Sequence, residues 1–556
     1  MSQFDTHTPF NLPQPFEGVN LFACDTALRE ALEREGAGWA TGELAALGAR
    51  LGSAATLDLG RLANANPPRL LQYDRAGRRI DELEFHPSWH ALMQQMIEQG
   101  VHASPWEGTQ EGRQVARAAR FFLFGQVENG AQCPVTMTYA CVPALRHAAP
   151  AIAQQWLPKI LSRRYDPRSL PVDEKEGALV GMGMTEKQGG TDVRANSTRA
   201  TPMPEHEARD RFGDMGEGAH TLVGHKWFFS APQADAHLVT AQAGEGDGAL
   251  GCFFVPRYLP DGSRNAIRVQ RLKDKLGNRS NASAEVEFCG AVGWPVGEAG
   301  RGIPTILEMA SHTRLDCVVG TAGIMRAALT HAVHHARTRS AFGRTLAEHA
   351  LMQNVLADLA LESEAATAFA MRLARSFDRA SYPAEALLAR VLTPAGKYWI
   401  CKRGPAFGAE AMEVLGGNGY VEDGPLARMY REFPVNSIWE GSGNVMCLDV
   451  LRAFARSPAV ADALGAELAL AAGLDAIYDS HCEQLLADLG SASEYAARDL
   501  AERMVVAVQA GLLLRHAPGF VSGAFVASRL ARPAGGAFGA LPAGVDAAAI
   551  VARALA

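Results

Sequence analysis

The sequence is poor in the features that mark exported, membrane and disulfide-bonded proteins. No run of about 18 apolar residues occurs, which argues against a membrane-spanning helix. The first residues, MSQFDTHTPFNLPQPFEG, contain neither the basic stretch nor the apolar core of a secretory signal. The nine cysteines are an odd number without a Cys-x-x-Cys pair, which argues against a disulfide framework and against a zinc knuckle. We expect a cytoplasmic protein without a bound metal.

Positive charge is also scarce. The 53 Lys and Arg residues are outnumbered by 60 Asp and Glu, so the net charge is −7 and the pI is near 6.2. Such a chain offers no broad cationic surface, and any site for a polyanion must be local. Hydrophobic residues, by contrast, make up 48% of the 556 residues, which is ample for roughly three or four domains with large cores.

The spacing of apolar residues changes along the chain and predicts an α+β protein of four parts. Helical spacing dominates residues 1–177, and short apolar runs bounded by Gly, Asp, Asn and Pro fill residues 178–295. Long helical stretches return in residues 296–456, and residues 457–556 form a further helical extension. We therefore expect a helical domain, an antiparallel sheet or small barrel, and an antiparallel helical bundle with an extra helical region.

Several smaller elements follow from local patterns. Asp25 is placed to cap a helix that ends at Gly36, and the runs LLQYD and RRIDELEF predict a hairpin. The polar stretch EARDRFGDMGEGAH is expected to be an exposed loop within the β part. Near the end of the sequence, ALGAELALAAGLDAIY and ARDLAERMVVAVQAGLLL predict two amphipathic helices, and an Ala-, Gly- and Pro-rich end follows them.

The stretch GMGMTEKQGGTDV, from Gly181 to Val193, is the first candidate for a binding site. Apolar residues lead into it like a buried strand, and the pair Gly189 and Gly190 allows either a positive φ or the close approach of a ligand. Hydroxyl groups and carboxylates lie around the pair. Both a backbone-lined pocket and an ordinary glycine turn fit this pattern.

Three separated motifs together resemble the acyl-CoA dehydrogenase superfamily. MTEKQGGTDV resembles its flavin-contacting loop, RSAFG resembles its Arg-x-x-Phe-Gly element, and LGGNGY followed by SIWEGSGN resembles its Leu-Gly-Gly-x-Gly-Tyr and aromatic-Glu-Gly-Thr motifs in the same order. The AidB branch of the superfamily is similar in further segments, among them LVGHKWFFS, FFVPR, RLKDKLGNRSNAS and AMEVLGG. The resemblance begins at THTPFN and extends to about Leu451.

The resemblance implies the order helical domain, β domain and helical bundle, with one FAD per subunit and a homotetramer. By motif match, three segments would line the flavin: Met184, Thr185, Glu186, Lys187, Gln188, Gly189, Gly190, Thr191, Asp192 and Val193; Ser230, Ala231 and Pro232; and Ile438, Trp439, Gly441, Ser442, Gly443, Asn444 and Leu448. The hydroxyl groups of the two threonines and the backbone around the glycine pair could bond to ring heteroatoms.

Two further elements of the resemblance leave alternatives open. An aromatic residue beside the flavin would correspond to Phe228 in the run KWFFS, although its neighbours Trp227 and Phe229 are equally suited to a core. Arg339 and Phe342 would reach the adenine and diphosphate end of the FAD of a neighbouring subunit, since the forked guanidinium suits a diphosphate. An arginine at a helix end could instead bind backbone carbonyl groups.

Glu440 takes the position of the catalytic base by the same resemblance. Dehydrogenation of a thioester needs a base for the α-proton, and Trp439 together with bound substrate would desolvate the carboxylate and raise its pKa. The alternative base position of some relatives corresponds to Thr313, whose hydroxyl group cannot serve. Glu440 could also merely hydrogen-bond its own loop, which leaves its role open.

The AidB branch also implies binding to double-stranded DNA through the C-terminal region and a role in the response to DNA alkylation. Phosphate binding requires clustered cations. From Pro458 to Ala556 the chain has six Arg, no Lys and ten Asp or Glu, and 6 − 10 gives −4. The remaining candidates are Arg452 and Arg456, and a basic run in the β part that equally fits a solvated strand edge: Arg264, Arg268, Arg271, Lys273, Lys275 and Arg279.

The functional expectation is therefore a FAD-dependent protein with weak or latent acyl-CoA dehydrogenase chemistry and possible DNA protection. The alternative is a metabolic acyl-CoA dehydrogenase without a DNA role. Two histidine groups, at positions 86 and 90 and at positions 331, 334 and 335, do not supply a third metal ligand in a fitting arrangement, and we expect no metal there.

Overall fold

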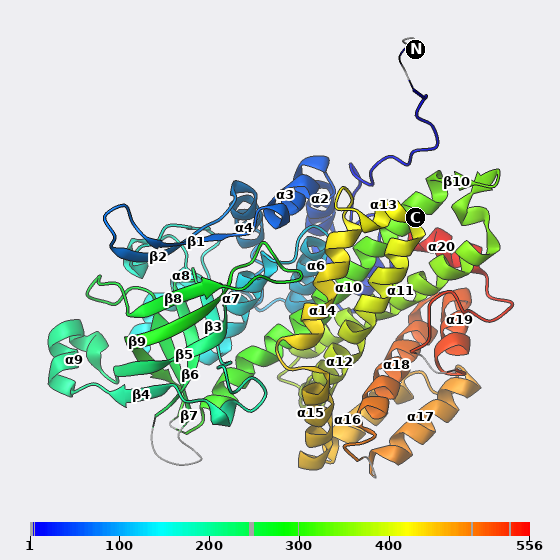
Figure 1. The fold of residues 1–556 in the computed structure, drawn as a ribbon. Helices are drawn as coiled ribbons and strands as arrows, with labels where there is room; N and C mark the ends of the chain where they lie inside the picture. Colours follow the sequence, from blue (N-terminus) through cyan, green and yellow to red (C-terminus); the bar gives the residue numbers. More distant parts are fainter. Residues whose placement is uncertain are drawn as a thin grey trace. The chain divides into compact units, whose positions relative to one another are not determined.

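The computed structural model describes residues 4, 6–243, 250–298, 300–490, 493–532 and 535–555 (Figure 1). The chain forms two compact units. The helical unit consists of Met1–Leu57, Gln114–Val127 and Cys317–Ala556, and the β unit consists of Asp58–Arg113 and Glu128–Asp316. The fold class is α+β, with a helical N-terminal region, a central β domain and C-terminal helical domains. The four-part division of the sequence stays a prediction.

The β unit is built on a seven-stranded sheet. Its strands are β3 (Val180–Gly183), β4 (Arg199–Pro202), β5 (His220–Ser230), β6 (Ala236–Gln242), β7 (Leu250–Pro256), β8 (Ile267–Leu272) and β9 (Ser283–Val296). Strands β6, β4, β5, β9 and β7 pair in that order, and β7 pairs back onto β6, so the sheet closes into a small barrel. Most pairings are antiparallel, but β3 and β4 run parallel to β6.

The barrel encloses a core of aliphatic and aromatic side chains. Inward-facing residues alternate along each strand, as the period of two requires. The fully buried members come from most of the strands: Ala200, Leu222, Phe229, Val239, Ala241, Phe253, Val255, Val269, Ala284, Val286, Phe288 and Ala291. The short apolar runs of the sequence therefore predicted these strands correctly, apart from β4, a four-residue strand that ends at Pro202.

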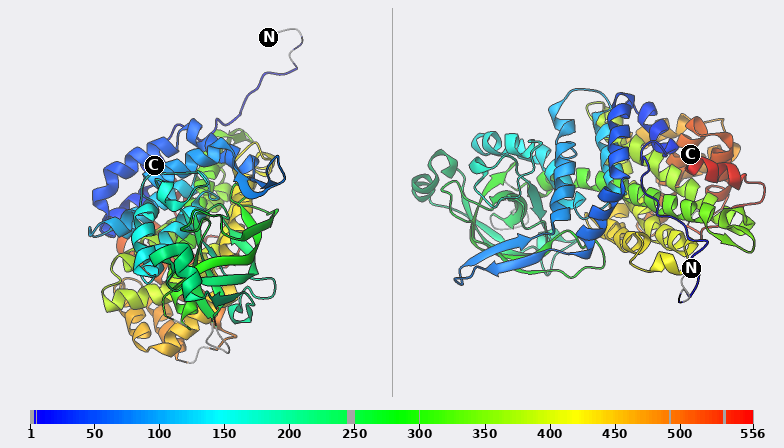
Figure 2. Two further views of the ribbon diagram at one scale, coloured as in Figure 1. Left: turned by 90° about the vertical axis from the view of Figure 1, so that its left-hand side faces the viewer. Right: turned by 90° about the horizontal axis from the view of Figure 1, so that it is seen from above.

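The predicted hairpin is confirmed as β1 (Arg69–Tyr73) and β2 (Arg79–Glu84), an antiparallel pair that lies beside β8 (Figures 1 and 2). The side chain of Gln72 binds the carbonyl groups of Val269 and Gln270 on that strand. The other helices and turns of the β unit are α4 (Pro87–Glu98), α5 (Ser104–Glu107), α7 (Gln132–Leu145), α8 (Pro150–Ile160), η2 (Val172–Glu174), η3 (Val193–Ala195) and η4 (Gly213–Gly216).

The prediction of an exposed loop at EARDRFGDMGEGAH is wrong in its first half, which forms helix α9 (Glu205–Phe212). Acidic residues lie in its first turn and arginines in its last, which complements the helix dipole. Ala208 and Phe212 are buried, and Phe212 packs edge-on against Trp294. Two contacts at this spacing are enough to fix a helix that composition alone does not indicate.

The helical unit contains the long helices that the sequence predicted. Asp25 caps α1 (Thr26–Arg34) by accepting a hydrogen bond from the backbone N–H of Leu28. Helix α10 (Gly302–Thr338) spans the boundary of the two units. The remaining elements before the extension are α2 (Thr41–Leu51), α3 (Ala54–Ala65), which also crosses the boundary, η1 (Gly38–Ala40), α6 (Arg113–Gly125), β10 (Ser340–Ala341), β11 (Arg344–Thr345), η5 (Leu346–Glu348), α11 (Ala350–Asp378), α12 (Pro383–Val414), α13 (Gly417–Tyr420), α14 (Leu426–Ile438) and α15 (Gly443–Arg456).

The C-terminal extension has more helices than predicted. The first expected helix is two, α16 (Ala459–Ala469) and α17 (Ala476–Leu489), because Gly473 has a φ of +79° and Asp475 caps the second helix. Helix α18 (Ala497–His516) matches the second expectation. The Ala-, Gly- and Pro-rich end, for which no helix was predicted, contains α19 (Gly519–Arg529) and α20 (Ala547–Ala554). Helices α16 and α18 pack on α12 (Figure 1).

Arginine side chains fix the extension to the long helices. Arg529 of α19 is buried and pairs with Asp358 and Glu362 of α11. Helix α20 ends against Arg326 and Arg337 of α10, which donate to its last carbonyl groups. No helix among the described residues is long and apolar enough to cross a membrane. All nine cysteines lie in the described part and carry free thiols.

Candidate functional site

A buried ion pair anchors the loop that follows β3. The carboxylate of Glu186 lies 2.8 Å from Nζ of Lys226 on β5, and neither side chain is exposed. The same carboxylate accepts hydrogen bonds from the backbone N–H and hydroxyl groups of both Ser197 and Thr198, and from the Gln188 amide. Burial alone would raise the pKa of Glu186, but Lys226 and these donors outweigh it and hold that pKa well below its usual range.

The predicted loop residues therefore divide into two groups. Glu186 turns its side chain inward, so only its backbone is available to a ligand. Lys187, Gln188, Gly190, Thr191 and Asp192 are exposed, and Met184, Thr185 and Val193 are half-buried. Among the described residues, no partner bonds to the hydroxyl groups of Thr185 and Thr191. These two donors are free to bind a ligand.

Gly189 is required for close packing. A Cβ at this position would lie 2.6 Å from Oδ1 of Asn196 and 2.8 Å from the carbonyl oxygen of Asp192, distances that folded proteins do not tolerate. The amide of Asn196 in turn donates to the carbonyl oxygen of Met184 at 2.7 Å. Gly190 has room for a side chain, and neither glycine has a positive φ. Gly189 thus allows the loop to pack tightly, and Gly190 lies on its open outer surface.

The three aromatic residues at the end of β5 have different surroundings. Phe229 belongs to the barrel core and stacks on His237 at a centroid distance of 4.0 Å. Trp227 is half-buried, and Nζ of Lys273 lies 3.4 Å from its ring centroid. Phe228 is 54% exposed. Core packing therefore accounts for Phe229, and Phe228 is the aromatic ring of the three with most surface available to a ligand.

The segment from Ser230 to Pro232 makes a strained turn. Ala231 is buried with a φ of +50°, which a residue with a Cβ rarely adopts. Its N–H donates to the carbonyl oxygen of Ala282, and its own carbonyl oxygen lies 3.2 Å from Nε2 of His237. Burial lowers the pKa of His237 to about 3, so its ring is neutral at physiological pH.

Glu440 lies in the sharp turn between α14 and α15. Its φ is +60° and that of Gly441 is +107°, so two consecutive residues leave the usual right-handed region. A non-glycine residue in this conformation stores strain, which is common at functional sites. The Glu440 side chain is half-buried. Nζ of the buried Lys397 on α12 donates to the carbonyl oxygen of Gly441 at 2.6 Å and fixes the turn.

Residues on both sides of Glu440 present a mixed surface. Ile438 is 64% exposed, and Trp439 is half-buried with an indole Nε1 that has no hydrogen-bond partner in the described chain. Ser442 and Asn444 are exposed at the start of α15, and Gly443 is buried against Tyr398. Oδ1 of Asn444 accepts from Nε of Arg498 at 2.9 Å, and Leu448 is half-buried one turn further on.

Arg339 and Phe342 lie at the β10–β11 hairpin. The Arg339 guanidinium donates to the backbone carbonyl oxygen of Asn11, whose side chain also bonds to both backbone groups of Ser340. Phe342 and Gly343 form the hairpin turn with φ values of +52° and +82°. Phe342 is 98% exposed, which is an unusual environment for an aromatic ring.

The candidate cations for DNA differ in their surroundings. Arg452 and Arg456 are exposed on one face of α15 and form no ion pair within the described residues. Three of the six cations of the β run are neutralised by carboxylates, because Arg264 pairs with Glu82 and both Arg271 and Lys273 pair with Glu285. Three of the six arginines of the extension are also neutralised by carboxylates: Arg503, Arg529 and Arg553.

Sequence reasoning missed the residues that support these segments. Lys226, Asn196 and Lys397 contact the candidate loops from neighbouring elements, and Arg498 contacts them from the extension. A lysine in an otherwise apolar stretch, as in PAGKYWIC around Lys397, is the only indication that the sequence offers for such a role. The histidines of the sequence have structural contacts, since His86 caps α4 and His334 binds the carbonyl oxygen of Gln14.

The arrangement of helical region, closed β domain and helical bundle is the acyl-CoA dehydrogenase-like fold. Three family models match consecutive parts of the chain: the adaptive response protein AidB N-terminal domain over residues 11–167, the acyl-CoA dehydrogenase middle domain over 181–291, and the acyl-CoA dehydrogenase C-terminal domain over 300–455. The chain therefore belongs to the acyl-CoA dehydrogenase superfamily and carries an AidB N-terminal domain.

Individual relatives agree with this assignment. AidB of Escherichia coli (strain K12), whose name marks its acyl-CoA dehydrogenase activity as unproven, is 51% identical over 92% of each chain. The crystal structure of Caenorhabditis elegans ACDH-11 in complex with C11-CoA has a TM-score of 0.84 and 26% identity, and it covers 100% of this chain and 94% of its own. The structure of Bd2924 in its apo form has a TM-score of 0.82 and 29% identity, with 91% and 100% covered.

Proposed function

We propose that this AidB-like member of the acyl-CoA dehydrogenase superfamily is a FAD-dependent oxidoreductase that acts, with weak or latent activity, on an acyl-CoA or a similar activated thioester. The strained turn at Glu440 carries the proposal. It presents one half-buried carboxylate next to Trp439, and Lys397 fixes the backbone that follows. Residues held in such a conformation persist only where their surroundings enforce it, and they are common at active sites. A relative crystallised with C11-CoA supports a thioester as the ligand.

The residues of the chain fit a flavin. The hydroxyl groups of Thr185 and Thr191 are unbonded among the described residues, and the exposed ring of Phe228 and the strained turn at Ala231 belong to the same unit. Isoalloxazine heteroatoms need donors of this kind beside an aromatic surface. In the helical unit, Trp439 offers an unbonded indole N–H, and Ser442 and Asn444 are exposed at the start of α15. Bound flavin would supply a hydride acceptor at N5.

A side chain of the protein would remove the proton of the substrate. Glu440 would take the α-proton of the thioester, and desolvation by bound substrate would raise its basicity. The alternative base position, Thr313, is buried and donates its hydroxyl hydrogen to the carbonyl oxygen of Ala310. That leaves the carboxylate of Glu440 as the group that can accept the proton.

The visible spectrum of the purified protein tests both parts of the proposal. We expect flavin absorbance after incubation with FAD, and its loss on anaerobic mixing with acyl-CoAs of several chain lengths. Glu440→Gln should keep the absorbance and lose the bleaching. Glu413→Gln, which changes an exposed glutamate on α12, should behave as the unmodified protein. A protein that binds no FAD refutes the cofactor assignment, and a flavin that no acyl-CoA reduces refutes the dehydrogenase assignment.

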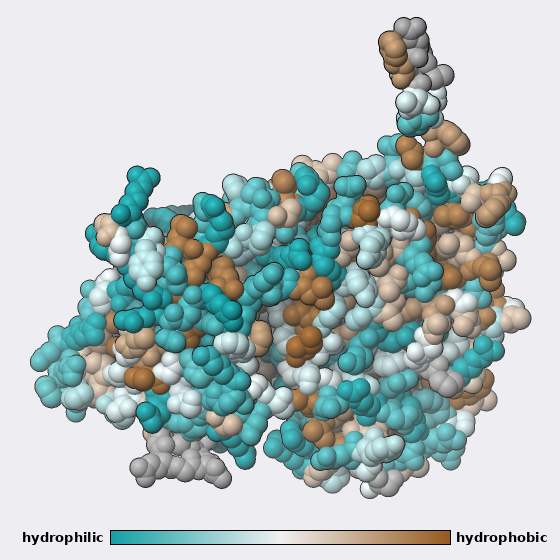
Figure 3. Space-filling view, viewed as in Figure 1, coloured by the Kyte–Doolittle hydropathy of each residue, from teal (hydrophilic) through white to brown (hydrophobic). Residues whose placement is uncertain are grey.

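A homotetramer is the second part of the proposal. Four exposed apolar side chains lie on the N-terminal segment, the β10–β11 hairpin and the start of α11: Phe10 (83%), Leu12 (60%), Phe342 (98%) and Leu351 (85%). Asn11 connects the first of these segments to the second. Apolar side chains gather near this hairpin in the space-filling view (Figure 3). A cluster of this kind is typical of a subunit interface.

Sedimentation velocity tests the interface. Phe342→Glu combined with Leu351→Glu should shift the protein to smaller species, because two buried carboxylates would be unpaired in the interface. Tyr495→Glu, which changes an equally exposed aromatic residue elsewhere, is the matched control. A protein that is monomeric before any substitution contradicts the proposal.

Binding of double-stranded DNA, with a role in protection from alkylation, remains the further candidate. The exposed and unpaired Arg452 and Arg456 favour it, whereas the neutralised arginines of the extension oppose a broad surface. A mobility-shift titration over a salt series should show affinity that falls with salt, with a smaller slope for Arg452→Gln and Arg456→Gln. Negligible binding at low salt would leave the metabolic acyl-CoA dehydrogenase as the better description.

A further inference from the structure

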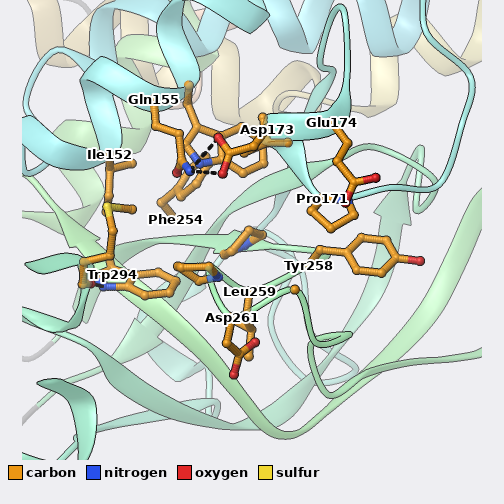
Figure 4. Close-up of a pocket in the computed structure, with 16 residues that line it drawn as sticks. Ile152, Gln155, Pro171, Asp173, Glu174, Phe254, Tyr258, Leu259, Asp261 and Trp294 are labelled. Carbon is orange, nitrogen blue, oxygen red and sulfur yellow. Dashed lines mark hydrogen bonds between the residues drawn. The ribbon is translucent and has the colours of Figure 1, made fainter. Parts of the chain in front are cut away.

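The β unit contains a cavity of about 290 Å³ whose lining shares no residue with the candidate flavin segments (Figure 4). Helix α8 contributes Ile152, Gln155 and Trp156, and the turn at η2 contributes Asp173 and Glu174. The other side is formed by β7, β9, the turn after β7 and Met215 of η4: Phe254, Pro256, Tyr258, Leu259, Pro260, Asp261, Gly262 and Trp294. An engineered apolar cavity of ~150 Å³ holds benzene, so this one has room for a ring with a short chain.

Most of the residues that line the cavity are apolar or aromatic. The indole rings of Trp156 and Trp294 and the ring of Phe254 are buried, and Trp156 meets Phe254 edge-on at a centroid distance of 4.8 Å. Nε1 of Trp294 donates to the carbonyl oxygen of Met215 at 2.7 Å, so the wall at this point is fixed. Figure 4 shows Ile152 and Trp294 on one side of the cavity and Pro171 and Tyr258 on the other.

The charge of the cavity is negative and is not neutralised from within. Its lining contains three carboxylates and neither Lys nor Arg. Asp261 pairs with Arg211 at 2.7 Å, but Asp173 accepts only from the Gln155 amide, and Glu174 has no side-chain partner in the described chain. Two cations lie nearby: Lys175 pairs with Asp235 at 2.6 Å, and Arg168 pairs with Asp166 at 2.7 Å and also donates to the backbone carbonyl oxygen of Glu174 at 3.2 Å.

We propose that this cavity binds a small organic cation: an ammonium group attached to an apolar body of about the size of a phenyl ring with a short chain. Aromatic rings attract cations through their negative faces, and the two carboxylates at the rim supply the counter-charge. An anion would meet repulsion here, and an uncharged apolar ligand would gain nothing from the two exposed carboxylates. The flat walls fit the apolar body, and the open side with Asp173 and Glu174 fits the ammonium group.

Three probes that share a phenylethyl group test the charge: 2-phenylethylamine, 2-phenylethanol and 3-phenylpropionate. Isothermal titration and saturation-transfer NMR on the full chain should give a Kd of about 1 mM or tighter for the amine. The alcohol should bind at least about tenfold more weakly, and the carboxylate should show no binding. Addition of salt should lower the affinity for the amine and leave the affinity for the alcohol unchanged, because salt screens only the interaction between charges.

Variants test the location. Asp173→Asn combined with Glu174→Gln should bring the amine to the affinity of the alcohol, and both residues are exposed, so folding should be unaffected. Glu205→Gln combined with Glu207→Gln removes two exposed charges of the same unit outside the cavity and should leave binding unchanged. Met215→Trp should fill the cavity and abolish binding of both the amine and the alcohol.

Three results would overturn the proposal. They are equal affinity for the three probes, full affinity of the amine for the Asp173→Asn, Glu174→Gln variant, and no detectable binding of the amine at about 10 mM. None of these results depends on flavin, so they do not bear on the proposed oxidoreductase function.

Discussion

The buried pair Glu186–Lys226 should control the stability of the β unit and the shape of the candidate flavin loop. Lys226→Met removes an ammonium group that contacts Glu186 at 2.8 Å and the carbonyl oxygen of Thr240 at 2.8 Å. Removing one partner of a buried ion pair costs about 3–5 kcal/mol. Glu186 keeps its five hydrogen bonds from Ser197, Thr198 and Gln188, so we expect the lower value, about 3 kcal/mol.

The opposite substitution should be more harmful. In Glu186→Gln only one side-chain oxygen remains as an acceptor. If it faces Lys226 and Thr198, the new amide NH₂ faces the N–H of Ser197; if the amide is flipped, the NH₂ faces Lys226 and the N–H of Thr198. We expect a loss of about 5 kcal/mol. The double variant should lose less than the sum of the two, because neither charge is left alone.

Thermal unfolding and hydrogen exchange of β5 and β6 measure these effects at pH 7. For a unit of this size about 3 kcal/mol corresponds to a decrease in Tm of roughly 10 °C. Arg78→Met is the matched control, because Arg78 and Asp74 form a surface pair that solvent screens and that contributes little to stability. If Lys226→Met shifts the Tm no more than Arg78→Met, or if Glu186→Gln is the milder of the two changes, the reasoning about the loop is refuted.

Three further predictions concern other contacts. Lys397→Met should remove the hydrogen bond to the carbonyl oxygen of Gly441 and lower kcat for acyl-CoA-dependent flavin reduction at least about tenfold, with little change in KM. An unchanged kcat would show that the turn keeps its conformation without Lys397. Arg529→Met should leave the buried Asp358 without its cation and Glu362 with Arg403 alone, and cost about 3–5 kcal/mol in urea unfolding. Arg532→Met, at an exposed position, should cost less than about 0.5 kcal/mol. Burial lowers the pKa of His237 to about 3, below its pKa of about 6.5 in the unfolded chain, so the unfolded state binds more protons between these two pH values. The free energy of unfolding should therefore fall as the pH decreases from about 6.5, by at most about 1.4 kcal/mol per pH unit. His237→Gln should reduce that slope, and an equal slope in both proteins would contradict the assignment.

Much of the fold was predictable because its patterns are local. Short apolar runs bounded by Gly, Asp, Asn and Pro predicted six of the barrel strands, and the cap at Asp25 and the hairpin β1–β2 depend on residues close in sequence. Helix α9 was not predicted, because its stability depends on the contact of Phe212 with Trp294, which is distant in sequence. The break between α16 and α17 was missed although Gly473 marks it, since an apolar stripe continues through the turn.

The sequence predicted which segments form the candidate site, but it did not predict the side chains that hold those segments in place. Motifs placed Glu440 and the loop around Gly189, but no pattern shows that Glu186 turns inward to Lys226 or that Lys397 reaches Gly441. Such contacts join residues about 40 positions apart, and only the fold brings them together. The same holds for the acidic cavity, whose lining comes from α8, η2 and three regions of the barrel.

The helical unit is discontinuous in sequence, and this determines when it can form during synthesis. Helix α1 buries Leu28, Ala31 and Leu32, and its main neighbour is α11, more than 300 residues later in the chain. The nascent polypeptide must therefore carry an unfinished apolar surface on α1 while the whole barrel is being made. Chaperone dependence during translation should accordingly be greatest before residue 378 leaves the ribosome, and it should decline once α11 can cover α1.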